Sequence, residues 1–446
     1  MKKSFTKQLI SLILAVCFTL AFPAFSFAAD SNQSDGEAKS ESIYNEFKKS
    51  DGELICVSKY GDTDKFPENS AEAVAAAAEK GADIVYVSVK KTSDGYVVLM
   101  ADSNLSRMCV DELGNTVNKN IGDVGYHELS SYHLRAGTGS LHEPITSCKI
   151  PTLAEAIQYL GGNAMLMIAD GWEYRDEIYD ILAGENALSN SIILATGDKK
   201  EISSWLASKT VMPLVISSSA KNGNAKSYVS KTLSAGCIGT LLSAKNPYNS
   251  VFKDGVQSKF KDAGRAVIDM TNSDICGGRE DNPTGWNDIT KRGFSVIITN
   301  DIEGFNAYRA RVKSYKTSLT SDLEKAQATD TALCSTSTAN KLKKTITEAK
   351  STLSSSMSET ELMEADYSLR LAMEALADRT ENDNGKTVTP GRITAVVLVV
   401  IALIIFEIVF DTLRRKKVSK RRTENGRAHS SGKNKILQYS KGCLSQ

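Results

Sequence analysis

The sequence predicts an α/β protein built as an eight-unit (β/α)8 barrel of the TIM type. Short runs rich in apolar and β-branched residues alternate with helical segments, and these runs are apolar along their whole length. Strands that are apolar on both faces belong in a parallel sheet covered by helices. An eight-unit barrel usually takes about 250 residues, which fits the repeating region. A doubly wound open sheet is the structural alternative.

The elements are predicted from the period of the apolar residues and from glycines that follow helices. The predicted strands are residues 54–58, 84–89, 97–100, 164–168, 191–195, 212–217, 238–242, 266–269 and 295–299. The predicted helices between them are residues 70–80, 152–160, 174–183, 200–209, 226–235 and 251–263. Gly81, Gly161, Gly236 and Gly264 each follow one of these helices.

Both ends of the chain carry segments typical of a membrane-anchored extracytoplasmic protein. Residues 1–28 combine early lysines, an apolar run and small residues at 26–28, and are predicted to be a signal peptide. Residues 392–412 are apolar enough to cross a bilayer as one helix. The basic residues that follow place the tail, 413–446, in the cytoplasm and the folded region outside. We therefore expect a single-pass protein of the cell membrane.

The remaining segments lie on either side of the barrel, which is predicted over residues 51–313. Residues 29–50 are a polar lead-in, predicted to be disordered over 30–42, and residues 381–391 are a polar linker. Residues 314–380 have apolar positions at three- and four-residue spacings, with breaks at 329–331 and 356–358. They predict three amphipathic helices that form a module or stalk. The last two are similar to small helical modules of surface proteins of Gram-positive bacteria.

The distribution of charge along the chain indicates which classes of partner the protein is suited to bind. Residues 412–446 carry 11 basic residues and one acidic residue, whereas the whole chain has a net charge of +1. The region outside the tail and the signal is therefore acidic. An acidic ectodomain does not suit nucleic acid, and the basic tail suits the inner face of a membrane.

The six cysteines of the predicted ectodomain permit disulfides, because they lie outside the membrane in even number. They are Cys56, Cys109, Cys148, Cys237, Cys276 and Cys334. Cys109 and Cys148 bracket a polar segment and are the pair to test. Cys56 and Cys237 lie in strand-like runs and are predicted to be buried thiols.

An ordered set of short motifs runs through the first half of the barrel. It comprises Lys59-Tyr60-Gly61-Asp62, Pro67-Glu68-Asn69-Ser70, Gly81-Ala82-Asp83, Tyr86-Val87-Ser88, Thr92-Ser93-Asp94-Gly95, Ala101-Asp102 and Leu105-Ser106-Arg107. This set resembles the glycerophosphodiester phosphodiesterase family, with its His-Arg-Gly, Pro-Glu-Asn-Thr, Gly-Ala-Asp, Glu-x-Asp, Thr-x-Asp-Gly, His-Asp and Leu-x-Arg. Ile150-Pro151-Thr152-Leu153 and Ile297-Ile298-Thr299-Asn300 extend the resemblance to about residue 308.

The resemblance implies a barrel that hydrolyses phosphodiesters, but its reactive positions are substituted here. Lys59 and Ala101 stand at the two family histidines, and Tyr86 and Ser88 stand at the metal-binding Glu-x-Asp. A protonated lysine accepts no proton, and neutral tyrosine and serine are poor ligands for calcium or magnesium. We therefore expect no catalytic residue, no metal ligand and no cofactor. None of the four histidines, His127, His133, His142 and His429, matches a family catalytic position.

Loops that follow the strands build the working face of such a barrel. The candidate pocket residues are Lys59, Glu68, Tyr86, Ser88, Asp102, Asp170 and Asp269. Glu68 and Asp102 match family positions, and both are predicted to have structural roles. Calcium or magnesium is expected only if Asp102, Asp170 or Asp269 forms a rearranged metal site.

Three functions follow from this sequence. The first is a catalytically degenerate barrel that binds a small glycerophosphate, a glycan or a protein at its strand ends and acts as a binding or regulatory surface protein. The second is an active hydrolase of glycerophosphodiesters, in lipid or glycerol metabolism, with a relocated metal site. The third is a structural spacer at the cell surface.

Overall fold

The structure is a computed structural model that describes residues 32–49, 53–218, 225–242, 259, 266–269, 281–332, 334–355 and 358–382. The chain divides into two compact units, Met1–Met373 and Glu374–Gln446. The predicted signal peptide, the 392–412 span, the basic tail, most of the 251–263 helix and Cys276 lie outside the described residues. Among the residues described, no helix is both long and apolar enough to cross a membrane.

Eight parallel strands form the core of the first unit. They are β1 (Ile55–Lys59), β2 (Ile84–Lys91), β6 (Met165–Ala169), β7 (Ser191–Ala195), β8 (Leu214–Ser218), β9 (Gly239–Leu242), β10 (Ala266–Asp269) and β11 (Val296–Thr299). Each strand pairs with its neighbour in this order, and β1 pairs with both β2 and β11. This closed arrangement confirms the predicted parallel α/β barrel and differs from an open sheet. A short strand, β3 (Val97–Leu99), extends β2 in antiparallel fashion.

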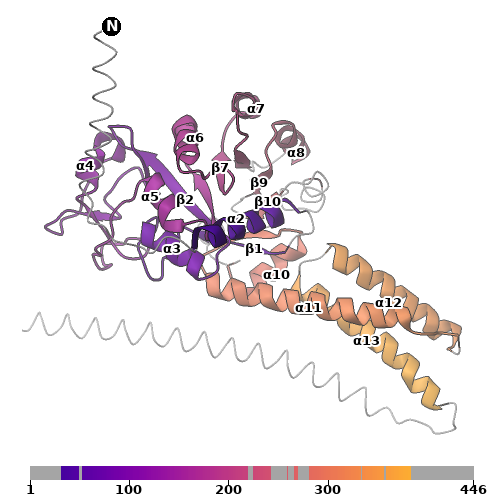
Figure 1. Ribbon diagram of the computed structural model, residues 1–446. Coiled ribbons are helices and arrows are strands. Elements are labelled where there is room, and N and C mark those ends of the chain that lie inside the picture. The colour runs from indigo at the N-terminus through magenta and orange to yellow at the C-terminus, as the bar shows by residue number, and fades with distance from the viewer. Residues whose placement is uncertain are drawn as a thin grey trace, which may run out of the picture. The chain divides into compact units, whose positions relative to one another are not determined.

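Helices cover the outside of the strands (Figure 1). They are α3 (Ala71–Glu79), α5 (Leu153–Leu160), α6 (Arg175–Gly184), α7 (Lys199–Ala207), α8 (Ala225–Ser234) and α10 (Pro283–Lys291), with a 3-10 turn, η2 (Trp172–Tyr174), before α6. Capping residues determine where some of these helices begin. Ser70 accepts a hydrogen bond from the amide of Ala73 at the start of α3, and Thr152 and Glu155 form a capping box on α5.

The polar segment after β3 folds as a small subdomain. It contains β4 (Cys109–Val110), the 3-10 turn η1 (Ile121–Asp123), α4 (Tyr126–Leu129) and β5 (His133–Leu134), and β4 pairs with β5. Its buried side chains, among them Leu105, Met108 and Leu134, form a hydrophobic cluster of their own with Val98 and Met100.

Cys109 and Cys148, the pair that the sequence offered as a candidate disulfide, are both free thiols. Leu134 separates them: it pairs with Cys109 on one side, and its amide donates to the carbonyl of Cys148 on the other. Two strand spacings amount to about 9.6 Å, which exceeds the ~7 Å that a disulfide can bridge between Cα atoms. Cys56 and Cys237 are buried thiols, as predicted.

The predicted disordered lead-in is instead helical, as α2 (Asn32–Lys48). Phe47 is 1% exposed, and together with Ile43 it belongs to the same hydrophobic cluster as the inward-facing residues of the barrel strands. The amide of Glu53, two residues before β1, donates to Oε2 of Glu46 in α2 at 3.1 Å, so α2 lies at the end of the barrel where the strands begin. Burial of this last turn explains why a mainly polar segment is ordered.

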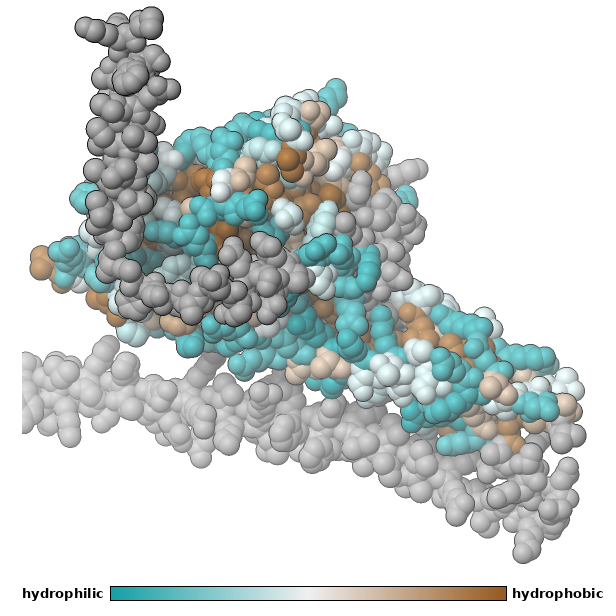
Figure 2. All heavy atoms as spheres, in the orientation of Figure 1, coloured by the Kyte–Doolittle hydropathy of each residue, from teal (hydrophilic) through white to brown (hydrophobic). Residues whose placement is uncertain are grey.

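Three long helices follow the barrel: α11 (Ile302–Ala328), α12 (Thr336–Ser355) and α13 (Glu359–Asn382). The helical prediction is confirmed, and the breaks lie close to the predicted positions. We refer to residues 314–373 as the helical module. Hydrophilic side chains cover much of its visible surface (Figure 2). The sequence places the start of the module at 314, whereas α11 begins twelve residues earlier, against the barrel.

Candidate functional site

The strand-end face of the barrel is built around inward-facing side chains of β1 and β2. Ile84 and Tyr86 belong to the cluster inside the barrel. Because side chains alternate along a strand, Ser88 and Lys90 follow on the same inner side. On β1, Lys59 occupies the corresponding position and lies in register with Tyr86. A lysine, a tyrosine, a serine and a second lysine therefore line this part of the face.

The backbone around these side chains is unusual. Tyr60, Asn69 and Asp170 have φ angles of 62°, 59° and 58°, a left-handed conformation that non-glycine residues seldom adopt. The conformation is held by hydrogen bonds: the amide of Tyr60 donates to the carbonyl of Tyr86 at 2.7 Å, and the amide of Asn69 donates to the carbonyl of Tyr60 at 2.9 Å. Such strained residues tend to cluster at functional sites.

Ser88 connects two loops of the face. Its amide donates to Oδ1 of Asn69 at 3.0 Å, and its hydroxyl donates to Oδ2 of Asp170 at 2.7 Å. The ammonium of Lys90 lies 3.9 Å from the same Asp170 oxygen. The serine at the second family metal position is thus engaged in contacts within the protein.

Tyr86, at the first family metal position, is also committed to the interior. It is 5% exposed, and its ring lies 5.7 Å from that of Tyr60, between centroids. Burial, with nearby Tyr60 and Asp170, raises the pKa of Tyr86 well above its ordinary value. The hydroxyl therefore stays protonated. Beside this pair, Lys59 is 7% exposed, and its ammonium lies 5.1 Å from the Tyr60 ring centroid, within cation-π range.

A second network joins Glu68, Arg107 and Asp102. Arg107 donates from Nη2 to Glu68 and from Nε to Asp102, each at 2.5 Å, and it also donates from Nη1 to the carbonyl of Thr138. The amide of Glu68 donates to the carbonyl of Gly137. The network therefore fastens the loop at 137–138 of the small subdomain to the barrel.

Burial dominates the titration of Glu68. It raises the pKa of this carboxyl, although the hydrogen bond and charge of Arg107 act in the opposite direction. Burial also acts on Arg107 to lower its pKa, but the hydrogen bonds to Glu68 and Asp102 outweigh burial and leave the pKa raised. Arg107 is therefore a permanent cation shared by two carboxylates.

The structure brings most of the predicted pocket residues into two groups. Lys59, Tyr86, Ser88 and Asp170 lie around the ends of β1, β2 and β6, and Glu68 and Asp102 meet through Arg107. Asp269 ends β10, which is separated from β1 by β11, and its side chain lies outside the part of the structure that is described.

Three residues of the site, Lys90, Asn69 and Arg107, were not among the predicted pocket residues. The strand period of β2 points to Lys90, since it continues the inward positions of Tyr86 and Ser88. The quoted Pro-Glu-Asn-Ser and Leu-Ser-Arg motifs contain the other two.

The described residues do not fit a divalent metal ion. No group of three or more histidine, cysteine, aspartate or glutamate side chains within the described ranges is arranged to hold one. Asp170 is the carboxylate beside Ser88, and the Lys90 ammonium already lies near it. A hard cation requires several converging oxygen ligands, and a neighbouring ammonium opposes its binding.

Comparison with known proteins places this arrangement in context. Residues 61–274 match the model of the glycerophosphoryl diester phosphodiesterase family. No curated protein matches the chain. Solved structures similar to it include a glycerophosphodiester phosphodiesterase from Agrobacterium tumefaciens, with 16% identity, 57% of this chain and 99% of that chain covered, and a TM-score of 0.44.

Two further solved structures are similar to the chain. A glycerophosphoryl diester phosphodiesterase from Parabacteroides distasonis has 19% identity, with 61% of this chain and 92% of that chain covered, and a TM-score of 0.47. A phosphodiesterase from Oleispira antarctica, in complex with the product sn-glycerol-3-phosphate, has 18% identity, with 57% and 96% covered, and a TM-score of 0.44.

Proposed function

Because this chain belongs, through residues 61–274, to the glycerophosphoryl diester phosphodiesterase family, we propose that it is a degenerate member that binds a ligand without hydrolysing it. The ligand occupies the strand-end face of the barrel. The protein acts there as a binding or regulatory protein of the cell surface.

The observation that carries this proposal is the state of the two family metal positions. Tyr86 is buried with a raised pKa, and Ser88 donates its hydroxyl to Asp170. Neither supplies a carboxylate, and Lys59 and Ala101 replace the family histidines. Hydrolysis of a phosphodiester needs proton transfer and charge neutralisation at the phosphoryl group. The first requirement is unmet, and for the second the face offers lysines in place of a metal ion.

The same side chains favour a small anionic ligand such as a glycerophosphate. Lys59 on β1 and Lys90, four residues beyond the register partner Tyr86 on β2, supply positive charge, and Tyr60 supplies an aromatic surface. Buried or partly buried cations attract anions more strongly than fully solvated ones. A glycan or a protein ligand would rely on the tyrosines and hydroxyl groups more than on the lysines.

The compartment is proposed from the sequence. Residues 1–28 direct secretion, 392–412 anchor the chain, and 413–446 face the cytoplasm. The barrel then samples ligands outside the cytoplasmic membrane. In the sequence, the helical module lies between the barrel and this anchor.

The test is binding of sn-glycerol 3-phosphate to the full chain in detergent micelles, measured by isothermal titration calorimetry with a chelator present. We expect binding to survive chelation and to weaken at least about tenfold in Lys59→Met, since loss of one charge contact costs on the order of 1.4 kcal/mol or more. Lys65→Met, at an exposed lysine, is the matched control.

Two other results would redirect the assignment. Metal-dependent release of glycerol phosphate from a glycerophosphodiester would establish the hydrolase alternative, with a site that uses Asp102, Asp170 or Asp269. Absence of binding to glycerophosphates, glycans and surface proteins alike, in a folded sample, would favour the structural spacer.

A further inference from the structure

One helix, α11, belongs to both the barrel and the helical module. Its first turns pack on the barrel through the buried side chains of Ile302, Phe305 and Tyr308. Its later turns bury Leu319 and Leu323, which lie within the module. The 27 residues of α11 span about 40 Å at 1.5 Å per residue. The helix therefore continues well past the barrel.

The contacts of α11 show at which end of the barrel it leaves. Arg309 pairs with Asp83 and donates to the carbonyls of Leu54 and Gly81, and Lys313 pairs with Glu53. These partners all precede β1 or β2. The module therefore extends from the end where the strands begin, opposite the strand-end face.

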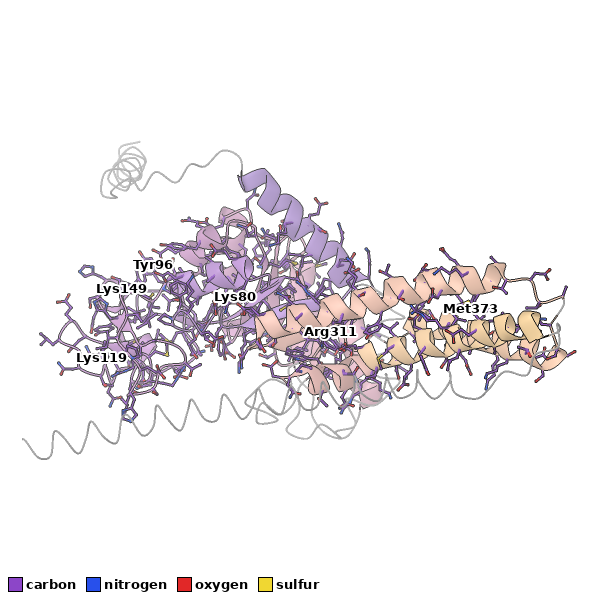
Figure 3. The ribbon with its side chains drawn as sticks, turned by 90° about the horizontal axis from the view of Figure 1, so that it is seen from below. Lys80, Tyr96, Lys119, Lys149, Arg311 and Met373 are labelled. Carbon is purple, nitrogen blue, oxygen red and sulfur yellow. The ribbon has the colours of Figure 1, made fainter. Side chains whose placement is uncertain are left out.

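The junction contains no residue that would make α11 bend. Between Phe305 and Ala328 the helix has neither glycine nor proline, and sharp kinks in helices almost always need one of these or a bulge. Figure 3 shows Arg311 where α11 leaves the barrel and Met373 far along the module. A continuous helix transmits orientation from one part to the other.

A second connection fixes the start of α13 to the barrel, and we name it the clamp. Asn287 of α10 donates to Oγ1 of Thr360 at 2.9 Å and accepts from the Ser358 hydroxyl at 3.0 Å and from the Thr360 amide at 3.1 Å. Arg311 donates to both oxygens of Glu359, at 2.7 and 3.1 Å. Ser358 is fully buried.

Several features make the clamp more than an exposed surface contact. The Arg311–Glu359 pair is bidentate, which adds geometric specificity, and Glu359 is only 20% exposed. Both the nitrogen and the oxygen of the Asn287 side-chain amide have hydrogen-bond partners. With α11, the clamp gives two separate attachments between the barrel and the module, and two attachments restrict rotation that a single linker would permit.

We infer that the barrel and the helical module, up to Met373, form one rigid body in which the module is locked to the end of the barrel opposite the strand-end face. The face then keeps one direction relative to the module, in contrast to a domain on a flexible tether. A ligand at the face is presented away from the module, whatever its chemistry.

The inference is tested by pulsed electron-electron double resonance on the full chain in detergent micelles. Spin-labelled noncanonical amino acids are placed at Tyr159 of α5 and Glu364 of α13, both exposed, which leaves the native cysteines unlabelled. A second pair, Tyr159 and Lys200, reports the width expected within the barrel. We expect a single distance population for the first pair, no broader than that of the second.

The clamp variant Asn287→Ala/Arg311→Ala should broaden the Tyr159–Glu364 distribution while the helical content, from circular dichroism, is unchanged. Glu324→Gln, an exposed change on the same helix, should leave the width as it is. A broad or multiple population in the unaltered chain overturns the rigid body. An unaltered width in the clamp variant overturns the role of the clamp.

Discussion

The hydroxyl of Ser88 donates a 2.7 Å hydrogen bond to Asp170, a residue 82 positions later in the chain. This contact joins strand β2 to the loop after β6 at the strand-end face. It uses the side chain at the second family metal position to hold the protein together. The Ser88–Asp170 hydrogen bond is thus one of the internal contacts that order the face.

Removal of that hydroxyl should loosen the face without abolishing the fold. Ser88→Ala is expected to cost about 1 kcal/mol of unfolding free energy, at the low end for a hydrogen bond to a charged group because Asp170 is half exposed. Urea unfolding of the full chain measures this. Ser103→Ala, at an exposed serine, is the matched control and should change stability by less.

The Glu68–Arg107–Asp102 network should contribute more to the unfolding free energy than the Ser88–Asp170 hydrogen bond does. Arg107→Ala leaves the Glu68 carboxylate, which is 4% exposed, without its cation. We expect a loss of about 2 kcal/mol, less than the full cost of breaking a buried pair because Arg107 is a third exposed. The loss should be smaller in Glu68→Gln/Arg107→Ala than in Arg107→Ala alone. An equal loss in both variants would contradict the role given to the network.

The pH dependence of stability follows from the direction in which the pKa of Glu68 is shifted. Its pKa in the folded protein is raised by burial, so the folded state binds more protons than the unfolded state between the two pKa values. Stability then falls as pH rises through this interval and is level above it. Arg107→Ala should enlarge the fall, because the cation that opposes the shift is gone. Thermal unfolding between pH 4 and pH 7 checks this.

Within the helical module, Asp366 and Asp322 should make stability depend on pH in opposite directions. Burial raises the pKa of Asp366, whose Oδ1 has no hydrogen-bond partner. Burial also acts to raise the pKa of Asp322, but hydrogen bonds from Lys325 and Arg370 outweigh it and leave the pKa lowered. The ionised Asp366 therefore costs stability above its pKa, whereas Asp322 loses stability as pH falls.

Asp366→Asn is accordingly expected to raise the unfolding temperature at pH 7, and Asp322→Asn to lower it. Each effect should be on the order of 1 kcal/mol. Differential scanning calorimetry of the two variants gives the comparison. A destabilising Asp366→Asn would show that its charged pairing with Arg370 outweighs its burial.

The helix α2 should behave as part of the barrel core. Phe47→Ala is expected to cost about 3–4 kcal/mol, typical for a buried phenylalanine, because Phe47 is 1% exposed. Glu41→Ala, at an exposed position of the same helix, should be nearly neutral. Equal unfolding free energies for the two variants would mean that the barrel does not use α2.

Much of the barrel could be predicted from sequence because its strands are apolar on both faces. Strands β7 and β10 have the predicted bounds, 191–195 and 266–269. The helix α2 could not be predicted from sequence. Only its last turns carry large apolar residues, Ile43, Tyr44 and Phe47, and a long polar segment precedes them. Its order depends on a tertiary contact that no local pattern reveals.

The contacts among the candidate site residues could not be predicted from the sequence. Lys59 and Tyr86 lie in register on β1 and β2, and Ser88 follows two residues later on the same side of β2. The Ser88–Asp170 contact was not predicted, because it depends on the register between β2 and β6, which sets Ser88 opposite Ala169, and on the left-handed backbone of Asp170. Sequence spacing alone specifies neither.

The most direct test of the central claim is an assay for release of glycerol phosphate from glycerophosphodiesters by the full chain in detergent micelles. Calcium, magnesium and manganese are each supplied, and a chelator serves as the control. The degenerate site predicts no turnover with any of the metals, in a sample whose folding is shown by a cooperative unfolding transition. Metal-dependent turnover that disappears in Asp102→Ala or Asp170→Ala would contradict it and establish a relocated hydrolytic site.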